Sequence, residues 1–405
     1  MSFKRPLQEF LAHAWGGIRR ADAAFVLAAL ATAAVLAFVP TGYENKDLRS
    51  VRARALVLDT WDEGIKNYGI LMQGEQIARV RVLSGVYEGL EAEAVNFLYG
   101  KADLDKLFRP GDRALIVIDP SNDEGKPAAL TLIDHYRIRW QAALVVLFFV
   151  LLLAYGGWTG FKSATSFAFT VTAIWKLLIP AFLRGVDPVL ASLATVAALT
   201  FVIIFLVTGF TRTGLAAFLG SMLGTAASAV IALAAAGPYR LNGAIRPFSE
   251  TLRFGGFEHL DLTRIFLAGT FLASSGAFMD LATDIAAALE ELHRKKPDLG
   301  FTELTYSGLT LGRKVIGTMS TTLLLAYTGG FTSLLMVFMA QGVPLENMFN
   351  LSYVSGEIFH TLMGSLGLVL VAPFTAAAAA FLFSTGPTVP GDGRQGPTAR
   401  PCGSR

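Results

Sequence analysis

The segment IFLAGTFLASSGAFMDLATDIAAAL, residues 265–289, decides the fold, because it is apolar enough to span a bilayer and yet contains two acidic residues. Asp280 and Asp284 are four residues apart, so a helix places both carboxylates on one face. Small residues continue that face: Ala273, Gly276, Ala277 and Ala287. A carboxylate at such depth costs at least about 2.5 kcal/mol. We therefore expect this face to line a polar interior between packed helices rather than to contact lipid.

The composition is that of a polytopic membrane protein. Hydrophobic residues make up 53% of the chain, charged residues only 16%, and the mean hydropathy is +0.51. The formal net charge of +3 is too small to indicate binding to nucleic acid. The single cysteine, Cys402, lies in a terminal segment rich in Gly, Pro and Ser, so neither a disulfide framework nor a thiolate metal cluster is expected.

Windows of about 20 apolar residues predict about eight membrane spans. They are 23–40, 141–158, 163–183, 188–210, 215–237, 264–289, 315–340 and 357–384. The first follows an amphipathic stretch, Phe3 to Trp15, that we expect to lie on the inner leaflet, so 1–40 form an interfacial helix and an uncleaved anchor. The second and third spans are separated only by residues 155–160 and should form a tight hairpin.

The distribution of Lys and Arg in the short connections predicts that both termini are cytoplasmic. The loop 238–263 then falls on the outer side, although it is basic. Either this loop forms structured backbone against the end of the bundle, or the number of spans near it is wrong by one. Pro180 and Pro373 are expected to kink or interrupt the third and last spans.

On this topology residues 41–140 are extracytoplasmic, and their sequence predicts β-structure. Residues 51–57 and 76–83 alternate with a period of two, and 91–98 and 114–118 continue the pattern between turn residues. Several short strands in this length predict a small OB-like barrel, which either binds a partner or serves as a structural cap. The terminal segment 385–405 has no periodicity and is expected to be a disordered tail after the seven-span core of 141–384.

Asp280 and Asp284 are the first candidate site residues, as a pair that binds a proton or a cation. Thr318, Thr321 and Thr322 in the seventh span are candidates because Thr322 should reach a depth close to that of Asp284. Two alternatives remain open. The carboxylates could form a structural ion pair, for example with Lys176, and the threonine hydroxyls could bond only to their own helix.

Glu357 and His360 begin the last span on one helical face. An E-x-x-H pair can ligate a metal in a helical bundle. Only one such pair occurs here, however, and it should lie about 15–20 Å from the aspartates, so no metal site is predicted. Glu357 is instead a candidate for an outer gate, and His360 is equally consistent with a packing role.

The sequence contains no P-loop, no Rossmann glycine pattern, no H-E-x-x-H and no nucleophile elbow. We therefore predict that the chain is not an enzyme and has no cofactor. Small residues in the fifth and last spans (Gly220, Gly224, Gly364 and Gly367) should allow close helix packing.

Several motifs together resemble the YibE/F-like family of bacterial integral membrane proteins. They are ASSGAFMD at 273–280, GRKVIGTM at 312–319 with TLLLAY at 322–327, and GEI at 356–358 with GSLGL at 364–368 and Pro373. The resemblance extends over about 50 to 383 and implies one N-terminal span, an extracytoplasmic β-rich segment and a seven-span core. The family has an Asp at the position of Asp280 and a Glu at that of Glu357. The resemblance implies a bacterial membrane protein of a kind often taken to be a permease, which we expect in the inner membrane. It gives no substrate.

The leading hypothesis is a secondary transporter or channel-like permease in which Asp280 couples to protons or cations or binds the substrate. The alternative is a non-transporting scaffold or envelope assembly factor whose β domain binds a partner. The candidate partners are the lipid bilayer, an ion, proton or small solute, an extracytoplasmic protein bound through 41–140, and a second copy of the chain.

Overall fold

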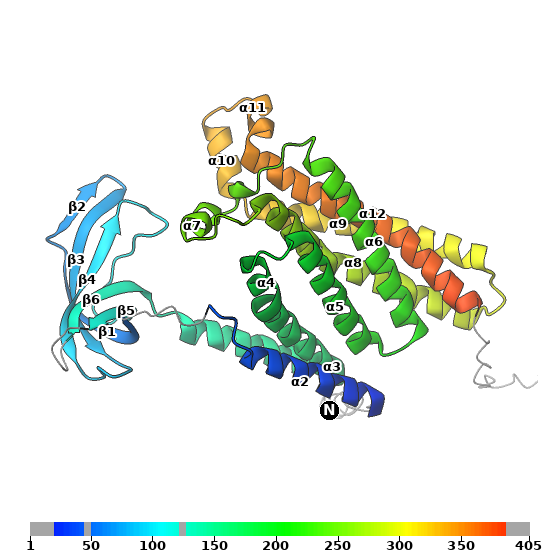
Figure 1. Ribbon diagram of the computed structural model, residues 1–405, viewed down its shortest axis with the longest axis horizontal. Helices are drawn as coiled ribbons and strands as arrows, with labels where there is room; N and C mark the ends of the chain where they lie inside the picture. The colour runs from blue at the N-terminus through cyan, green and yellow to red at the C-terminus, as the bar shows by residue number, and fades with distance from the viewer. Residues whose placement is uncertain (1–19, 44–49, 121–126, 386–405) are drawn as a thin grey trace, which may run out of the picture. The chain divides into compact units, whose positions relative to one another are not determined.

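The computed structural model describes residues 20–43, 50–120 and 127–385, in which a run of strands follows the first helix (Figure 1). These residues belong to two compact units, one from Pro40 to Leu152 and one formed by the chain on either side of it. The interfacial helix predicted at 3–15 and the tail predicted after Thr385 lie outside the described residues.

The first unit is built from β-strands. They are β1 (Val51–Trp61), β2 (Ile65–Tyr68), β3 (Leu71–Val82), β4 (Glu91–Tyr99), β5 (Arg113–Pro120) and β6 (Pro127–His135). The four predicted strand segments fall on β1, β3, β4 and β5, while β2 and β6 were not predicted. Alternation explains the core: in β1 the side chains of Ala53, Ala55 and Val57 are buried and their neighbours point outward.

The strands close into a small barrel. The sheet order is β1-β5-β6-β4-β3-β2, and an additional antiparallel pairing of β1 with β3 joins its ends, which leaves β2 as a flap on β3. Neighbouring strands are antiparallel except β4 and β6, which are parallel. The prediction of a small barrel is thus confirmed, and the structure closes it with five strands.

A buried polar clamp anchors the connection from β4 to β5 inside this barrel. The Gln76 side chain donates to the Phe108 carbonyl and accepts from the Phe108 amide, both at 3.0 Å. Asn96 donates to Gln76 at 3.1 Å and to the Lys106 carbonyl at 2.6 Å. Because Gln76 satisfies both backbone groups of Phe108, the Phe108 ring, 1% exposed, can fill the barrel core.

The second unit is helical. Its long helices are α2 (Arg20–Phe38), α3 (Ile138–Ala173), α5 (Pro188–Thr208), α6 (Arg212–Ala236), α8 (Leu262–Lys295), α9 (Phe301–Gly329) and α12 (Ser352–Ser384). Helix α3 enters this unit at residue 153 from the unit that contains the strands. The short elements are the π-helix η1 (Ile174–Leu178), α4 (Ile179–Leu183), the 3-10 helix η2 (Gly243–Ile245), α7 (Ser249–Phe254), α10 (Thr332–Ala340) and α11 (Leu345–Asn350).

The described residues contain six helices long and apolar enough to cross a membrane, or seven if α9 and α10 are one broken span. Eight spans were predicted, and the difference has two sources. The 46 residues of 138–183 count as one span here, although non-helical backbone angles at Gly157, within the predicted turn at 155–160, divide them into two helices. The seventh predicted span is bent by 69° between α9 and α10.

The two prolines have different surroundings. A π-helical turn, η1, immediately precedes Pro180, so the helix there is locally irregular. Pro373, in contrast, lies inside α12, which continues as helix to Ser384. Of the two predicted effects, a kink or an interruption, the interruption does not occur at Pro373. Its ring is on an exposed part of the helix, and flanking residues such as Val371 and Ala372 are buried and hold the helix in place.

Contacts between helix ends show that successive helices alternate in direction. At one end Lys162 pairs with Asp22 at 3.1 Å, and the Arg212 guanidinium donates to the Leu382 carbonyl at 3.5 Å. At the other end Arg264 pairs with Asp187. The loop 238–263 also lies at this second end, where it forms η2 and α7. Of the two alternatives given for this loop, structured backbone against the end of the bundle is therefore the one observed.

Glycines bring α6 and α12 into close contact at the centre of the bundle. A methyl group added to Gly220 would lie 2.6 Å from the Thr375 Cα atom, and one added to Gly224 would lie 3.0 Å from the Val371 Cα atom. Helix α8 packs beside this pair, where the Phe278 ring occupies the space over Gly367. These contacts fix the position of α8, the helix that carries the aspartates.

Candidate functional site

Helix α8 has one buried face and one open face. Its N-cap residue Asp261 accepts a hydrogen bond from the Arg264 amide at 3.0 Å, and its last turn is basic, which suits the helix dipole. Large apolar side chains such as Phe278, Leu281 and Ile285 are buried in the bundle core. The opposite face, which includes Asp280 and Asp284, therefore points away from α6 and α12.

Both aspartates line one cavity of about 390 Å³ between three helices. Its walls are Ile203, Ile204 and Val207 of α5, Met279, Asp280, Thr283 and Asp284 of α8, and Met319 of α9. We call this cavity the acidic groove. The groove has apolar walls on its α5 and α9 sides, whereas its polar groups all come from α8. The structure thus brings the two carboxylates together with one hydroxyl in a single space.

Neither carboxylate is neutralised by a basic side chain among the described residues. No ion pair or hydrogen bond joins Asp280 or Asp284 to another described side chain, and the Thr283 hydroxyl has no described partner either. The alternative of an ion pair with Lys176 is not found, since the Lys176 ammonium donates to the Val39 carbonyl at 3.1 Å. The groove is therefore a site of uncompensated negative charge.

The small-residue face of α8 is open rather than enclosed. Ala273, Gly276 and Ala287, like both aspartates, are exposed, and no described atom lies within 4 Å of where a Gly276 side chain would begin. The expectation that packed helices enclose this face is wrong for the described chain. The physical reason is that α5 and α9 flank α8 without covering it, so the acids open onto the groove.

The threonines of α9 do not join the aspartates. Thr318, Thr321 and Thr322 donate to the carbonyls of Val315, Gly317 and Thr318 at 2.9–3.0 Å. These hydroxyls therefore bond to their own helix, which is the alternative that the sequence left open. Helix α9 contributes Met319 to the groove instead. None of the three threonines lines the groove in the described structure.

Glu357 lies at the other end of the bundle, in a polar cluster around Arg246. The Arg246 guanidinium bonds to the Glu357 carboxylate and, at 3.0 Å, to the Nδ1 atom of His360. The Tyr327 ring stacks on His360 with 4.3 Å between ring centroids, and the guanidinium lies 4.8 Å from the Phe266 ring. We call Arg246, Glu357, His360 and Tyr327 the polar cluster.

This bonding fixes the state of His360. A guanidinium only donates hydrogen bonds, so Nδ1 must accept and the proton of the neutral ring is on Nε2. His360 is 7% exposed, and its Nε2 atom has no hydrogen-bond partner within the described chain. Among the described residues no group of three or more His, Cys, Asp or Glu side chains could hold a metal ion. Glu357 and His360 thus act here as partners of an arginine.

Sequence reasoning did not identify Arg246 and Tyr327 as members of this cluster. The only signal for Arg246 was the unusual basic loop at 238–263, which the structure explains because its guanidinium neutralises Glu357. The loop is held tightly at this point. A methyl group added to Gly356 would lie 2.2 Å from the Ile245 Cδ1 atom, so the loop packs against the first turns of α12.

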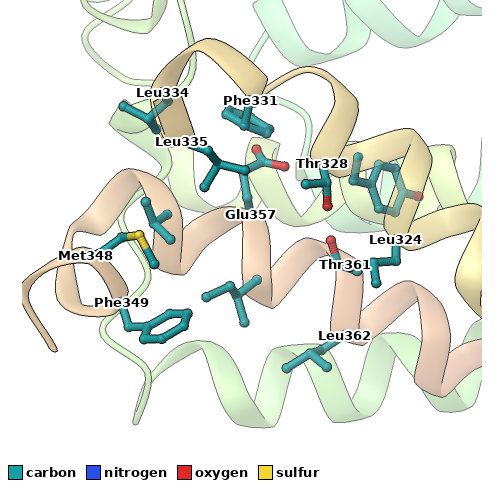
Figure 2. Close-up of a pocket in the computed structure, with 13 residues that line it drawn as sticks. Leu324, Thr328, Phe331, Leu334, Leu335, Met348, Phe349, Glu357, Thr361 and Leu362 are labelled. Carbon is teal, nitrogen blue, oxygen red and sulfur yellow. The ribbon is translucent and has the colours of Figure 1, made fainter. Parts of the chain in front are cut away.

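A second cavity, of about 240 Å³, adjoins the polar cluster between α9, α10, α11 and α12 (Figure 2). Its walls are almost entirely apolar and include Leu324, Phe331, Leu335, Met348, Phe349 and Leu362. Glu357, Thr328 and Thr361 supply oxygen atoms on its boundary. We call this space the apolar pocket. It is separate from the acidic groove, since the two share no lining residue.

Long apolar helices and an inserted β-barrel unit together define this fold as that of a helical membrane protein. The chain belongs to the YibE/F-like family, because the model of the YibE/F-like protein matches residues 144–385, more than half of the chain. That match covers the helices that form the acidic groove and the polar cluster. Neither a search of curated proteins nor one of solved structures found a match.

Proposed function

We propose that this protein is a secondary transporter or channel-like permease that binds protons or cations at Asp280 and Asp284. The observation that carries the proposal is the pair of carboxylates, without a basic partner among the described residues, on one cavity of about 390 Å³. A cavity of this volume is in the range of small-ligand sites, about 300–1,000 Å³. The structure thus supplies both negative charge and space for an ion with its water, or for a small solute.

The cost of placing carboxylates within a membrane supports a role for these acids. On insertion scales an aspartate near the centre of a membrane helix costs about 2.5–3.5 kcal/mol, and α8 carries two, one turn apart. No described contact offsets that cost. Water, a shared proton or a bound cation in the groove would do so, because each weakens the repulsion between like charges.

The experiment measures ion flux in proteoliposomes with a trapped pH dye and a sodium or potassium gradient. We expect Asp280→Asn to abolish protein-dependent flux and Asp284→Asn to reduce it several-fold. The matched control is Glu290→Gln, an exposed acid on the same helix outside the groove, which should behave as wild type. Full flux in the Asp280→Asn protein would contradict the proposal.

Stability separates this proposal from the scaffold alternative. In a permease Asp280 has no structural partner, so Asp280→Ala should leave the melting temperature in detergent within about 2 °C of wild type, as surface substitutions usually do. If the acids only stabilise the helix packing of a scaffold, the same substitution should lower the melting temperature markedly. In that case the wild-type protein should show no protein-dependent flux either.

One observation favours the scaffold alternative, and it lies in the β unit. The flap formed by β2 and β3 exposes Tyr68 (60%) and Ile70 (94%), and Tyr99 at the end of the neighbouring strand β4 is 63% exposed. Exposed apolar patches of this kind are found where proteins bind partners. If the protein is a scaffold, Ile70→Lys should weaken the binding of a partner that is isolated together with the full chain. If it is a permease, the same substitution should leave ion flux unchanged.

A further inference from the structure

The apolar pocket has the features of a binding site for an amphiphile. Its side walls are apolar residues of four helices, and the 69° bend between α9 and α10 forms one end of it. Its volume of about 240 Å³ corresponds to roughly eight liquid waters. Water against these walls would find few hydrogen-bond partners, so an apolar molecule is the better occupant.

Unpaired oxygen atoms lie together on one side of the pocket. Figure 2 shows the Thr328 and Thr361 hydroxyls directed toward each other, with the Glu357 carboxylate beside Phe331. Among the described residues neither hydroxyl has a hydrogen-bond partner, whereas most threonines of α9 donate to the preceding turn. One Glu357 oxygen bonds to Arg246, and the other lies 3.8 Å from the His360 Nδ1 atom, which already accepts from Arg246.

Charge balance selects the kind of headgroup. Arg246 neutralises Glu357, and His360 is neutral because its Nδ1 atom accepts a hydrogen bond. A charged headgroup would lose its hydration here without meeting an uncompensated opposite charge. The available oxygens of Glu357, Thr328 and Thr361 can accept hydrogen bonds, so a neutral group that donates one is favoured.

We propose that the apolar pocket binds a neutral amphiphile, such as a long-chain alcohol or another lipid with a free hydroxyl group. Its apolar chain would lie against Leu335, Met348 and Leu362, and its hydroxyl group would donate to Glu357 or Thr361. This site is independent of the acidic groove and does not require that the protein transports ions.

The test uses the full chain in lipid nanodiscs and a diazirine-bearing long-chain alcohol, with labelled residues mapped by mass spectrometry. We expect labelling within the α9–α12 pocket, and competition by 1-decanol at least tenfold better than by decanoate or decylamine. Equal competition by the acid or the amine, or labelling spread evenly over the exposed helices, would overturn the proposal.

Variants separate the site from general contact with lipid. Leu335→Trp fills the pocket and should reduce labelling at least tenfold. Thr361→Val removes one acceptor and should reduce it about fivefold, the usual effect of one hydrogen bond, while Thr361→Ser should restore it. The control is Thr310→Val, which removes a hydroxyl that donates only to its own helix, at the Tyr306 carbonyl. Labelling of Leu335→Trp at the wild-type level would overturn the proposal even if Thr361→Val fails to fold.

Discussion

At the scale of single residues, the structure separates charges that are neutralised from charges that are not. Lys162 is paired with Asp22, and Glu357 is paired with Arg246. Asp280 and Asp284 have no such partner among the described residues. Of the acidic groove, the polar cluster and the apolar pocket, only the acidic groove therefore offers a charge that no described side chain neutralises.

The Asp22–Lys162 pair should contribute strongly to stability because the Lys162 side chain is only 8% exposed. Asp22→Asn leaves that ammonium without a carboxylate, so we expect a loss of about 3 kcal/mol in the free energy of unfolding. Thermal unfolding in detergent measures it. Asp298→Asn, an exposed acid at the same end of the bundle, is the control. The double variant Asp22→Leu with Lys162→Met should recover most of the loss, and a failure to recover would contradict a purely electrostatic cost.

Glu91 gives the β unit a pH dependence. Hydrogen bonds from Arg81 and Arg79 lower the pKa of Glu91 from its ordinary value of 4.5. A carboxyl whose pKa is lowered on folding adds stability above its unfolded pKa, and that stability is lost as the pH falls through the folded pKa.

We therefore expect Glu91→Gln to unfold at a lower temperature than wild type at pH 7, with the difference disappearing as the pH falls below about 4. The β-sheet band of the infrared amide I region follows this transition in the full chain. A difference that persists unchanged at low pH would show that the two arginines do not act through the Glu91 charge.

At the scale of elements, close helix contacts decide which substitutions the bundle tolerates. The α6–α12 contact leaves no room beside Gly220, whereas Gly269 of α8 has no described atom within 4 Å of an added methyl group. Both glycines are inside helices, so the change in helix propensity from glycine to alanine is the same at the two positions.

Gly220→Ala should destabilise the protein by about 2 kcal/mol, because the Thr375 backbone of α12 must move. Gly269→Ala should be neutral or stabilise by up to about 1 kcal/mol, since alanine is the better helix former. Melting temperatures of the two variants in one detergent provide the comparison. Equal melting temperatures would mean that α6 and α12 are not in close contact.

At the scale of the whole molecule, the contacts at the two ends of the bundle group the basic residues as the topology requires. Lys162 and Arg212 lie at the end where α2 begins, and Arg246 and Arg264 lie at the opposite end. The first end also carries the basic end of α8, Arg294, Lys295 and Lys296, so the larger number of positive charges makes it the expected cytoplasmic one.

Single-cysteine labelling in intact cells tests this orientation, with Cys402→Ser as the background. We expect Arg253→Cys and Lys66→Cys to react with a membrane-impermeant maleimide, and Lys296→Cys to react only after the membrane is opened. Reaction of Lys296→Cys in intact cells would reverse the predicted orientation.

The sequence by itself determined the properties that depend on local periodicity. Apolar runs located the helices, alternation located β1, β3, β4 and β5, and a spacing of four residues placed Asp280 and Asp284 on one face. Only the tertiary structure decided whether that face is covered and which charges meet. Arg246 and Glu357 are 111 residues apart in the chain, so their contact depends on how a loop docks onto α12. The strand order of the barrel and the open groove are likewise set by packing between distant segments, about which local patterns carry no information.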